Sequence, residues 1–370
     1  MAAPSVAVIG GGIIGCATAY ELAKRGCRVT LLERASPGGE ASSAAAGLLA
    51  ALGSSPDPDP FRRLALESWR RYPGVAAELR ELTGVDVEHM TAGTLYPLRS
   101  PRDLESGRER CGWPLARELG VEVVEGSLLR SLEPALSKDM SAALLVRGDH
   151  WVNNQRLVTA YAQAAAARGV AVRAGALVDR ILVEGGRARG VLVDGEAFHA
   201  EAVLLAAGAW SGALAASIGA RLPVEPVRGQ MLAVSNVPPI VTRVIHGDDV
   251  YVVPRPSGEL LVGATVEHAG FVRAVTPDGL AGLIAPAVAL VPEIGRRPIT
   301  RTWCGFRPWA PDGQPVLGPW PDVAGLFTAT GHYRNGILLA PVTAALLTRC
   351  IVDGETPPSL TPFLPGRFRR

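Results

Sequence analysis

Short apolar runs open the chain and recur along it at wide intervals. Residues 6–9 and 28–32 each form one such run, and the segment between them ends in Lys24, Arg25 and Gly26, as helices commonly do. Apolar runs of this length are typical of strands buried in a parallel sheet. The pattern therefore predicts a strand–helix–strand unit at the very start of the chain.

Two later apolar runs predict that the chain returns to the same sheet. Residues 202–208 are apolar throughout, and residues 326–331 lead through a polar turn into a long helix from Gly336 to about Val352. The segments between these runs have a different pattern. We therefore expect an α/β protein whose Rossmann-like domain is built from three chain segments, together with an α+β domain that has a mainly antiparallel sheet.

The first intervening segment mixes helices and strands. From Phe61 to about Thr83 the apolar residues recur mostly at helical spacing, with a break expected at Pro73-Gly74. The further elements that we expect are a strand at 93–97, a helix at 108–119, a strand at 121–124, a helix at 157–168, and strands at 171–173, 178–183 and 189–193.

The second intervening segment, residues 222–308, is rich in strand patterns. A hairpin signal stands at Pro256-Ser257-Gly258, and a helix is expected between Gly279 and Leu290. The predicted strands are 230–234, 250–253 and 260–262.

A glycine motif at the end of the first run indicates a ligand. Gly10, Gly12 and Gly15 have the GxGxxG spacing of dinucleotide-binding proteins, and Glu33 closes the second run. Gly10 allows a tight turn, Gly12 lets the backbone approach a pyrophosphate, and Gly15 lets the helix pack close to the sheet. Glu33 can accept hydrogen bonds from a ribose diol. The unit predicts an adenine dinucleotide site; the alternative is a structural glycine turn in another α/β protein.

The sequence contains this motif once, whereas flavoproteins reduced by NAD(P)H usually carry a second nucleotide motif. A single bound FAD, reduced by its substrate, is therefore favoured over a pyridine-nucleotide reductase. Residues 38–49 are small and rich in serine, so they either pass close to the ligand or form an ordinary flexible loop. The domains that we expect are an FAD-binding domain of residues 1–88, 146–222 and 303–370 and a substrate-binding domain of residues 89–145 and 223–302.

Composition narrows the function further. The chain has 370 residues, of which 48% are hydrophobic and 19% charged, with a net charge of +2, as in a globular protein of two domains. Because no long run of one charge sign occurs, we expect no nucleic-acid partner. No uncharged apolar stretch reaches the length of a membrane span. Five scattered cysteines without a CxxC motif favour a reducing compartment and argue against a metal site. We expect a soluble, cytoplasmic protein.

Three polar side chains could recognise a small anion. Arg307, Arg334 and Tyr251 each lie in or beside an apolar run, and an arginine fork with a tyrosine hydroxyl suits a carboxylate. Taken singly, each arginine could equally be a surface residue. His246 and His268 have no obvious partners, and we interpret them as structural or solvated residues. The positive end of the helix that begins near Asn335-Gly336 would stabilise negative charge on a flavin.

Several stretches together resemble one protein family. They are residues 8–15, 43–49, 228–230, 251–254, 262–265, 305–318 and 331–341. In this order they resemble the D-amino-acid oxidase family of FAD-dependent oxidoreductases, and within it the glycine oxidases of thiamine biosynthesis.

The resemblance implies roles for individual residues. Arg307 would hold the substrate carboxylate, with Tyr251 and Arg334 nearby, and Val178 would contact the adenine end of FAD. The residues that would line the FAD are Ile13, Ile14, Glu33, Arg34, Ala41, Ser42, Ala46, Gly47 and Leu48. The residues that would cover the flavin ring are His332, Tyr333, Arg334, Asn335, Gly336, Ile337 and Leu338.

The resemblance also implies an activity. The protein would oxidise glycine, and other small amines or D-amino acids, to an imine that hydrolyses to an oxo acid such as glyoxylate and ammonia. Oxygen would accept the electrons and give hydrogen peroxide, in the service of thiamine thiazole synthesis, and the protein would form a homo-oligomer, a tetramer. Two alternatives stay open: a D-amino-acid dehydrogenase that passes electrons to a quinone, and a non-catalytic FAD-binding protein.

The chain departs from its relatives at three places. Trp309 stands where many carry a small residue, which bears on the size of the pocket. Asn153-Asn154 replaces a common Asp-Pro pair, with little effect expected on the chemistry. Monomeric sarcosine oxidases hold flavin through a cysteine whose equivalent here is Gly305, and Cys304 lies one residue away, on the opposite face of a strand. We therefore expect non-covalent FAD.

Overall fold

The apolar runs form the centre of a six-stranded sheet. In the computed structural model, which describes residues 3–53 and 55–368, β1 (Ser5–Ile9) pairs in parallel with β2 (Arg28–Glu33) and with β12 (Ala202–Leu205). β12 pairs in parallel with β19 (Leu326–Thr330) on its other side. The sheet is completed at its edges by β8 (Ala171–Ala174) and by the antiparallel β18 (Val316–Pro319). The prediction that three separate segments return to one sheet is confirmed.

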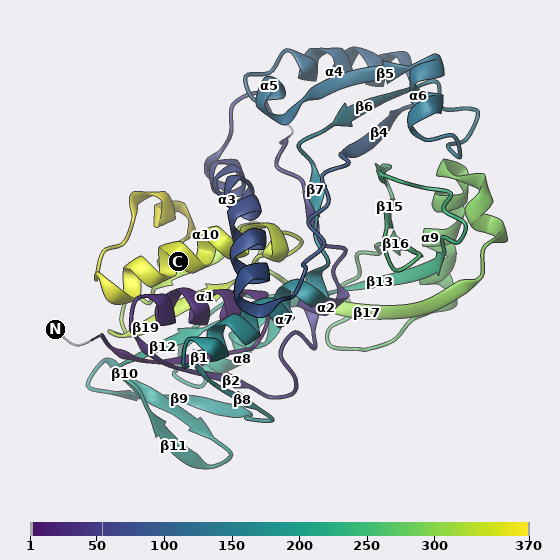
Figure 1. Cartoon of the computed structure of the whole chain (residues 1–370). Helices are drawn as coiled ribbons and strands as arrows, with labels where there is room; N and C mark the ends of the chain where they lie inside the picture. Colours follow the sequence, from purple (N-terminus) through teal and green to yellow (C-terminus); the bar gives the residue numbers. More distant parts are fainter. Residues whose placement is uncertain (1–2, 54, 369–370) are drawn as a thin grey trace.

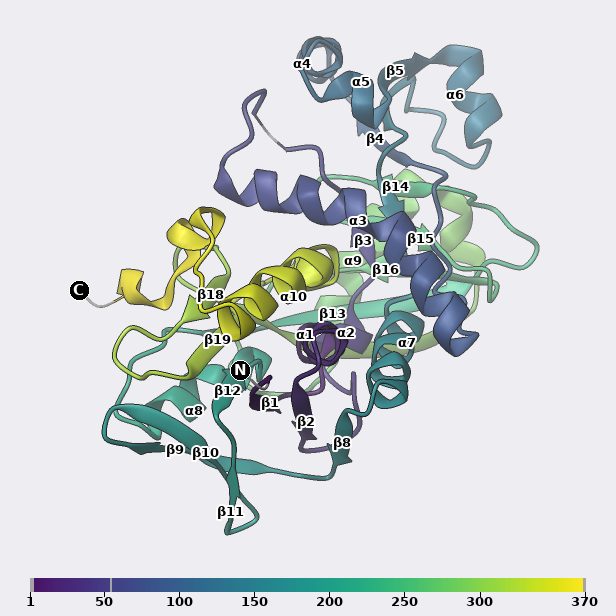
Figure 2. The same ribbon diagram turned by 60° about the vertical axis from the view of Figure 1, so that its left-hand side comes forward.

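Helices cover one side of this sheet. The first helix, α1 (Ile13–Lys24), packs between α7 (Asn154–Ala167) and α10 (Gly336–Val352), and Figure 2 shows the three side by side. Most residues of α1 and α10 are buried, which fits helices that are apolar around most of their circumference. The predicted bounds of α10 are those of the structure.

The helix predicted with a break at Pro73 is continuous. α3 (Pro60–Thr83) starts at Asp59, whose side chain accepts a hydrogen bond from the Arg62 N–H at 2.8 Å, and runs through Pro73. A proline inside a helix costs about 3 kcal/mol because it removes a hydrogen bond and crowds the preceding turn. Here α3 packs along α10, and the buried Tyr72 donates its hydroxyl to the Ile337 carbonyl. Tertiary packing offsets the local cost, so the predicted break is wrong.

A second, eight-stranded sheet forms the other half of the molecule (Figure 1). Its long edge pair is β13 (Glu225–Ser235) with β17 (Ile299–Trp309), which run antiparallel. All its pairs are antiparallel except the one between β14 and β4. The other strands, in sheet order, are β16 (Glu259–Gly263), β15 (Tyr251–Pro254), β14 (Val244–His246), β4 (Thr94–Leu98), β6 (Ala142–Val146) and β5 (Val121–Glu125).

The hairpin and the helix predicted within residues 222–308 are both present. The hairpin predicted at 256–258 joins β15 to β16, and the predicted helix is α9 (Pro277–Leu290). β17 crosses the domain boundary proposed between residues 302 and 303, since its last residues still pair with β13.

The helix predicted at 108–119 is instead two helices. α4 (Pro101–Cys111) starts earlier because Ser100 and Asp103 form a reciprocal capping box, with Asp103 N–H donating to the Ser100 hydroxyl at 3.1 Å. It ends at Gly112, and α5 (Ala116–Leu119) follows after a turn that contains Pro114. Apolar residues do recur at helical spacing here, but the turn at Pro114 divides the segment into two helices.

Smaller elements complete the chain. They are a three-stranded sheet of β9 (Val178–Glu184), β10 (Arg187–Val193) and β11 (Glu196–His199), the pair β3 (Leu48–Leu49) and β7 (His150–Trp151), the helices α2 (Ala41–Ala44), α6 (Gly126–Leu132) and α8 (Ser211–Ala216), and the 3-10 helices η1 (Gly208–Trp210), η2 (Pro292–Arg296), η3 (Pro358–Phe363) and η4 (Pro365–Phe368).

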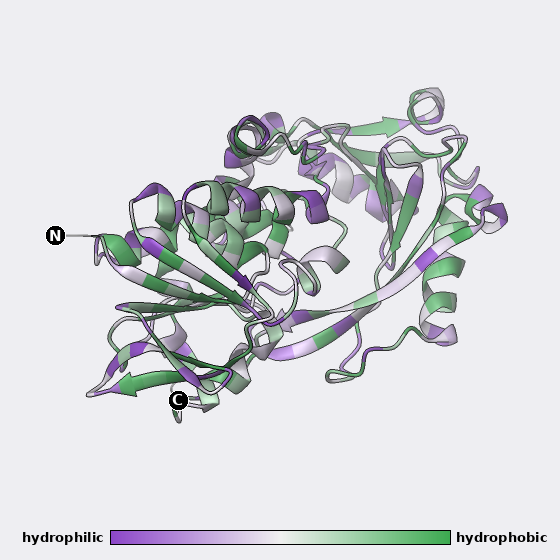
Figure 3. Ribbon diagram, turned by 60° about the horizontal axis from the view of Figure 1, so that its bottom comes forward, coloured by the Kyte–Doolittle hydropathy of each residue, from purple (hydrophilic) through white to green (hydrophobic). Residues whose placement is uncertain are grey.

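Hydrophobic residues concentrate in the strands and on the inner faces of the helices, whereas the outer turns are hydrophilic (Figure 3). Among the described residues, no helix combines the length and the apolar character needed to cross a membrane.

Candidate active site

A cavity of about 830 Å³ lies where the two sheets meet. One wall comes from the carboxyl ends of the parallel strands: Gly10 follows β1, Glu33 ends β2, Ala206 follows β12 and Thr330 ends β19. The opposite wall comes from the strands of the eight-stranded sheet. Ligands of open α/β sheets bind at this edge, outside the carboxyl ends of the strands.

The glycine motif shapes the first wall as predicted. Gly10 has φ +105°, and a Cβ there would lie 2.5 Å from the Ala206 carbonyl oxygen. A Cβ on Gly15 would lie 1.9 Å from the carbonyl oxygen of Gly10, so only glycine lets α1 pack this close to the sheet. Gly12, the N-cap of α1, has no side chain to cap the helix, and its N-terminus therefore faces the cavity with backbone groups.

Glu33 is held in place by the backbone of both neighbouring turns. Its Oε2 accepts a hydrogen bond from the Gly11 N–H at 2.7 Å, and its Oε1 accepts one from the Ala35 N–H at 2.9 Å. Each carboxylate oxygen has a second lone pair, so it can still accept from a ribose hydroxyl. The neighbouring Arg34 pairs with Glu40 at 2.6 Å and stacks 3.7 Å above the Trp210 ring.

The segment after β2 is tied down by side chains from elsewhere. The Ser42 hydroxyl accepts a hydrogen bond from the Ile13 N–H at 2.9 Å. Asn154 donates to the Ser42 carbonyl at 2.6 Å, and Arg255 donates to the Ala46 carbonyl at 3.0 Å and to the Asn154 side chain at 3.1 Å. Asn154, noted above only as a departure from relatives, thus orients the small-residue segment that lines the cavity.

These features fit an adenine dinucleotide such as FAD. Glycines whose Cβ would clash with neighbouring backbone, the N-terminus of α1 and an oriented carboxylate lie together at one wall of the cavity. Nearly all residues predicted to bind FAD line the cavity: Gly10, Gly12, Ile13, Ile14, Glu33, Arg34, Ala41, Ser42, Ala46, Gly47, Leu48, Val178, His332, Tyr333, Arg334, Asn335, Gly336 and Ile337. Gly15 and Leu338 do not line it: Gly15 packs α1 on β1, and Leu338 lies in the hydrophobic core.

Arg307 lies across the cavity from the glycine motif, on β17. Its guanidinium lies flat against Gly229 of β13, where a Cβ would be 2.3 Å from Nη2. Nη1 donates to the Thr265 carbonyl at 2.9 Å. Burial lowers the pKa of Arg307 from its ordinary value. Among the ion pairs of the described residues, none involves Arg307, so its charge is available to an anion in the cavity.

Tyr251 and Arg334 line the same cavity from different directions. The Tyr251 hydroxyl lies beside Gly263, where a Cβ would be 2.9 Å from it, and burial raises the pKa of this tyrosine. Arg334 is exposed, with its guanidinium carbon 5.1 Å from the centre of the Tyr333 ring. The structure thus brings the three predicted anion-binding residues to one cavity, two of them partly buried and one exposed.

The segment between β19 and α10 is held in an unusual backbone conformation. Tyr333 has φ +49°, rare for a residue with a side chain, and its N–H donates to the Pro308 carbonyl at 2.8 Å. The buried His332 contacts the Thr343 hydroxyl at 3.2 Å, and burial lowers the pKa of its imidazole to about 3. His332 is therefore neutral at physiological pH.

Two of the residues singled out in the sequence lie outside the cavity. Trp309 packs edge-on against His268, with ring centres 5.6 Å apart, and is not among the lining residues. Cys304 is buried and does not line the cavity, whereas Gly305 does, and a Cβ on Gly305 would lie 2.5 Å from the Ala44 Cβ.

His246 corrects the sequence interpretation. It lines the cavity, with its ring 5.3 Å from that of Tyr96 and 5.8 Å from that of Tyr251. Sequence patterns did not reveal this because its two aromatic neighbours lie on two other strands, β4 and β15. Trp210 was also missed, although it follows a buried parallel strand closely, a position where ligand contacts are common. Among the described residues, no group of three or more His, Cys, Asp or Glu could hold a metal.

Comparison with known families decides the class of protein. A model of the FAD dependent oxidoreductase family matches residues 5–350. The chain belongs to this family. Membership confirms the predicted resemblance and FAD as the cofactor.

Individual members of the family match nearly the whole chain. Glycine oxidase of Geobacillus kaustophilus (strain HTA426) is 38% identical over 363 residues, covering 97% of this chain and 95% of that protein. The crystal structure of glycine oxidase from Geobacillus kaustophilus matches with a TM-score of 0.91 at 35% identity, covering 98% of each chain. The bifunctional protein ThiO/ThiG of Trichormus variabilis (strain ATCC 29413 / PCC 7937) is 37% identical over 99% of this chain and 55% of its own length.

Proposed function

We propose that this family member is an FAD-dependent oxidase that deaminates glycine and other small amines or D-amino acids and releases hydrogen peroxide. The observation that carries the proposal is the partly buried Arg307, without a carboxylate partner among the described residues, in the same cavity as the glycine motif. The similarity to glycine oxidases over the full chain supports the substrate class. In line with the resemblance described above, we place this activity in thiamine thiazole synthesis.

Residues of the first wall would hold the cofactor. The N-terminus of α1 would receive the pyrophosphate, Glu33 the ribose, and the segment 332–337 would cover the flavin ring. When bound, FAD would supply the acceptor for the hydride of the substrate α-carbon, with oxygen as the final electron acceptor.

Arg307 and its neighbours would bind and orient the substrate. The guanidinium presents a planar fork that matches a carboxylate bidentately, and burial strengthens this pairing because competing water is excluded. Tyr251 would donate a further hydrogen bond to the same carboxylate. Substrate bound as a carboxylate with a neutral amine needs orientation rather than a side-chain base, since the reacting C–H bond only has to face the flavin.

The proposal also includes the binding mode of FAD, the location of the protein, its oligomeric state and its substrate preference. FAD binds non-covalently, which is supported by Gly305 at the position where a flavin-linking cysteine would stand and by Cys304 outside the cavity. The protein acts in the cytoplasm as a homo-oligomer, a tetramer by resemblance to its family. A bound carboxylate substrate carries the specificity, so small amino acids are favoured over simple amines.

One assay tests the proposal. Purified protein is offered glycine, sarcosine, D-alanine and larger amino acids in air, and hydrogen peroxide and oxygen uptake are measured together. We expect stoichiometric peroxide with glycine or another small member of the panel. Reduction of the flavin without peroxide, with turnover restored by a quinone, would instead indicate a D-amino-acid dehydrogenase. A flavin that no amino acid bleaches under anaerobic conditions would indicate a non-catalytic FAD-binding protein.

A further inference from the structure

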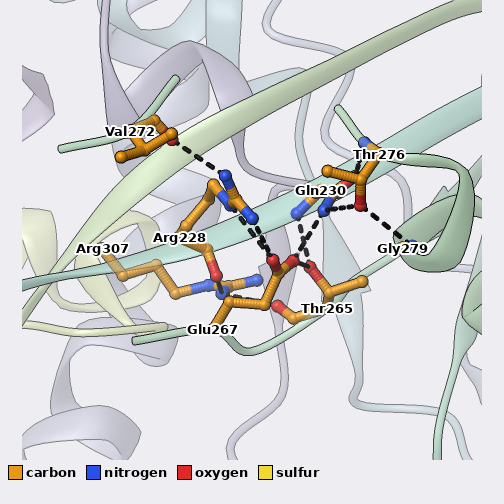
Figure 4. A network of polar contacts seen from close by, with 8 residues as sticks. All are labelled: Arg228, Gln230, Thr265, Glu267, Val272, Thr276, Gly279 and Arg307. Carbon is orange, nitrogen blue, oxygen red and sulfur yellow. Dashed lines mark hydrogen bonds and ion pairs between the residues drawn. The ribbon is translucent and has the colours of Figure 1, made fainter. Parts of the chain in front are cut away.

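The anchor of Arg307 consists of two backbone carbonyls. Its Nη1 donates to the carbonyl oxygen of Thr265 at 2.9 Å and reaches that of Arg228 at 3.5 Å (Figure 4). Arg228 lies on β13, and Thr265 follows β16. The direction of the guanidinium therefore depends on two carbonyls from different strands.

One carboxylate ties both carbonyl-bearing residues together. Glu267 exchanges two backbone hydrogen bonds with Arg228, at 2.9 and 3.0 Å. Its Oε2 accepts from Arg228 Nε at 3.1 Å and forms an ion pair with Nη2 of the same side chain. Its Oε1 accepts from the Thr265 hydroxyl. Both residues that anchor Arg307 are thus held by Glu267.

The buried Gln230 links this carboxylate to the rest of the sheet. Its side-chain amide donates to Glu267 Oε1 at 2.9 Å and to the Thr276 hydroxyl at 3.1 Å, while its N–H donates to the Thr265 hydroxyl at 2.8 Å. The Thr276 N–H donates back to the Gln230 side chain at 2.8 Å. Because Thr276 is the N-cap of α9, the network joins β13, the loop after β16 and the start of a helix.

The charges of Arg228 and Arg307 are balanced in different ways. Arg307 reaches the backbone of Arg228, and the guanidinium of Arg228 pairs with Glu267. That leaves Arg307 without a carboxylate partner among the described residues. A substrate carboxylate would balance the charge of Arg307, as Glu267 balances that of Arg228.

We propose that Glu267 is a positioning residue for Arg307. It neutralises Arg228 and holds the carbonyls of Arg228 and Thr265, so that the fork of Arg307 faces the cavity in the geometry that receives a carboxylate. This inference rests on the proposed function, because it takes Arg307 to be the carboxylate-binding residue. A purely structural role for Glu267, limited to fixing the loop 264–276, is the competing explanation.

A double-mutant cycle separates the two explanations. Four FAD-loaded proteins are compared: the wild type, Glu267→Gln, Arg307→Ala and the double variant. For each, kcat/KM for glycine and its separate kcat and KM are measured, together with the dissociation constant of acetate from the change in flavin absorbance. Glu259→Gln is the matched control, since Glu259 also pairs with an arginine, Arg301, on strands of the same sheet.

We expect Glu267→Gln to lower kcat/KM at least about tenfold, the size of one weakened charge-assisted hydrogen bond. The loss should appear in KM and in the acetate dissociation constant, with kcat and FAD content close to those of the wild type. In the Arg307→Ala background the same change should have no further effect, because a residue that acts through Arg307 cannot act without it. Glu259→Gln should leave all of these values unchanged.

The results distinguish a failure of the proposed function from a failure of the positioning role of Glu267. If Arg307→Ala leaves kcat/KM unchanged, the carboxylate site of the proposed function is wrong. If Arg307→Ala has a large effect but Glu267→Gln has none, or has the same effect in both backgrounds, only the positioning role is wrong. If Glu267→Gln does not yield FAD-loaded protein, Thr265→Val takes its place in the cycle: it removes the hydroxyl bonded to Glu267 and keeps the carbonyl that anchors Arg307. The same criteria then apply.

Discussion

At the scale of single residues, the chemistry depends on a few groups whose surroundings change their ordinary behaviour. Arg307 is partly buried without an ionic partner among the described residues, and His332 is kept neutral by burial. Arginine and histidine are common on protein surfaces, where their presence alone indicates no function. Burial makes them informative, because a desolvated group interacts more strongly with whatever faces it.

Replacing Arg307 tests the substrate contact directly. Arg307→Ala should raise the KM for glycine about 100-fold or more, since a buried bidentate pair with a carboxylate is lost, while the protein stays yellow. Steady-state kinetics and the flavin spectrum measure both effects. Arg301→Ala, an exposed residue on the same strand, serves as the control and should change KM little. Unchanged kinetics in Arg307→Ala would remove this residue from the site.

The neutral His332 predicts a pH dependence of stability. Its pKa is lowered to about 3 in the folded protein, so the unfolded chain binds the proton more readily at mildly acidic pH. Stability contributed by the neutral ring is therefore lost as pH falls below about 6.5, by about 2 kcal/mol at pH 5.

Denaturant unfolding at pH 7 and pH 5 checks this expectation. His332→Asn should lose stability less steeply between the two pH values than the wild type does. A variant of the exposed His199, His199→Gln, should keep the slope of the wild type. Equal slopes in all three proteins would mean that His332 is not buried in its neutral form.

At the scale of elements, the contact between α1 and β1 determines whether the cofactor cradle can form. Gly15→Ala would place a Cβ 1.9 Å from the Gly10 carbonyl oxygen, so the helix must move away from the sheet. We expect a loss of about 3 kcal/mol in stability and a large loss of bound FAD. Thermal unfolding and the ratio of flavin to protein absorbance measure both.

Gly74→Ala is the matched glycine control. Gly74 lies inside α3, where a Cβ would meet nothing within 4 Å. This substitution should raise stability by about 0.5–1 kcal/mol, because alanine loses less backbone entropy in a helix than glycine does. If Gly15→Ala were as well tolerated as Gly74→Ala, close packing at Gly15 would not matter.

The elements also show where local patterns succeed and where they fail. The long helix α10 was predicted with its observed bounds, because its apolar run is bordered by clear signals on both sides. The break predicted in α3 at Pro73 and the single helix predicted at 108–119 were wrong. The first prediction gave Pro73 too much weight, since packing against α10 keeps α3 continuous. The second rested on apolar spacing alone and overlooked the turn at Pro114.

At the scale of the whole molecule, the cofactor cavity is formed by both sheets together. FAD bound there would contact segments from both ends of the chain, so its removal should weaken the contact between the two halves. Ligand binding stabilises the folded state by about 2.7 kcal/mol at a concentration 100 times its dissociation constant.

Removal of FAD is the corresponding test. Acid precipitation should release all the yellow colour, as expected for non-covalent binding, and the apoprotein should unfold at a lower temperature than the holoprotein. Titration with FAD should restore the unfolding temperature. Flavin that remains with the precipitated protein would contradict non-covalent binding.

Sequence patterns alone identified the cofactor and the family, and nearly all the residues that they singled out for FAD line the cavity. These features depend on short-range rules: a glycine motif between two buried strands, an acid at the end of the second, and characteristic stretches in a characteristic order. The roles assigned to Arg307, Tyr251 and Arg334 remain predictions, but their residue types and positions were already visible.

The surroundings of these residues depend on the tertiary structure and could not be predicted from local patterns. The carbonyls that anchor Arg307, the carboxylate of Glu267 behind them, and the place of His246 and Trp210 in the cavity all depend on strands that are distant in sequence. Local patterns predict which residues share a strand or a helix face. They contain no information on which strands become neighbours, because strand pairing depends on burial of the whole core.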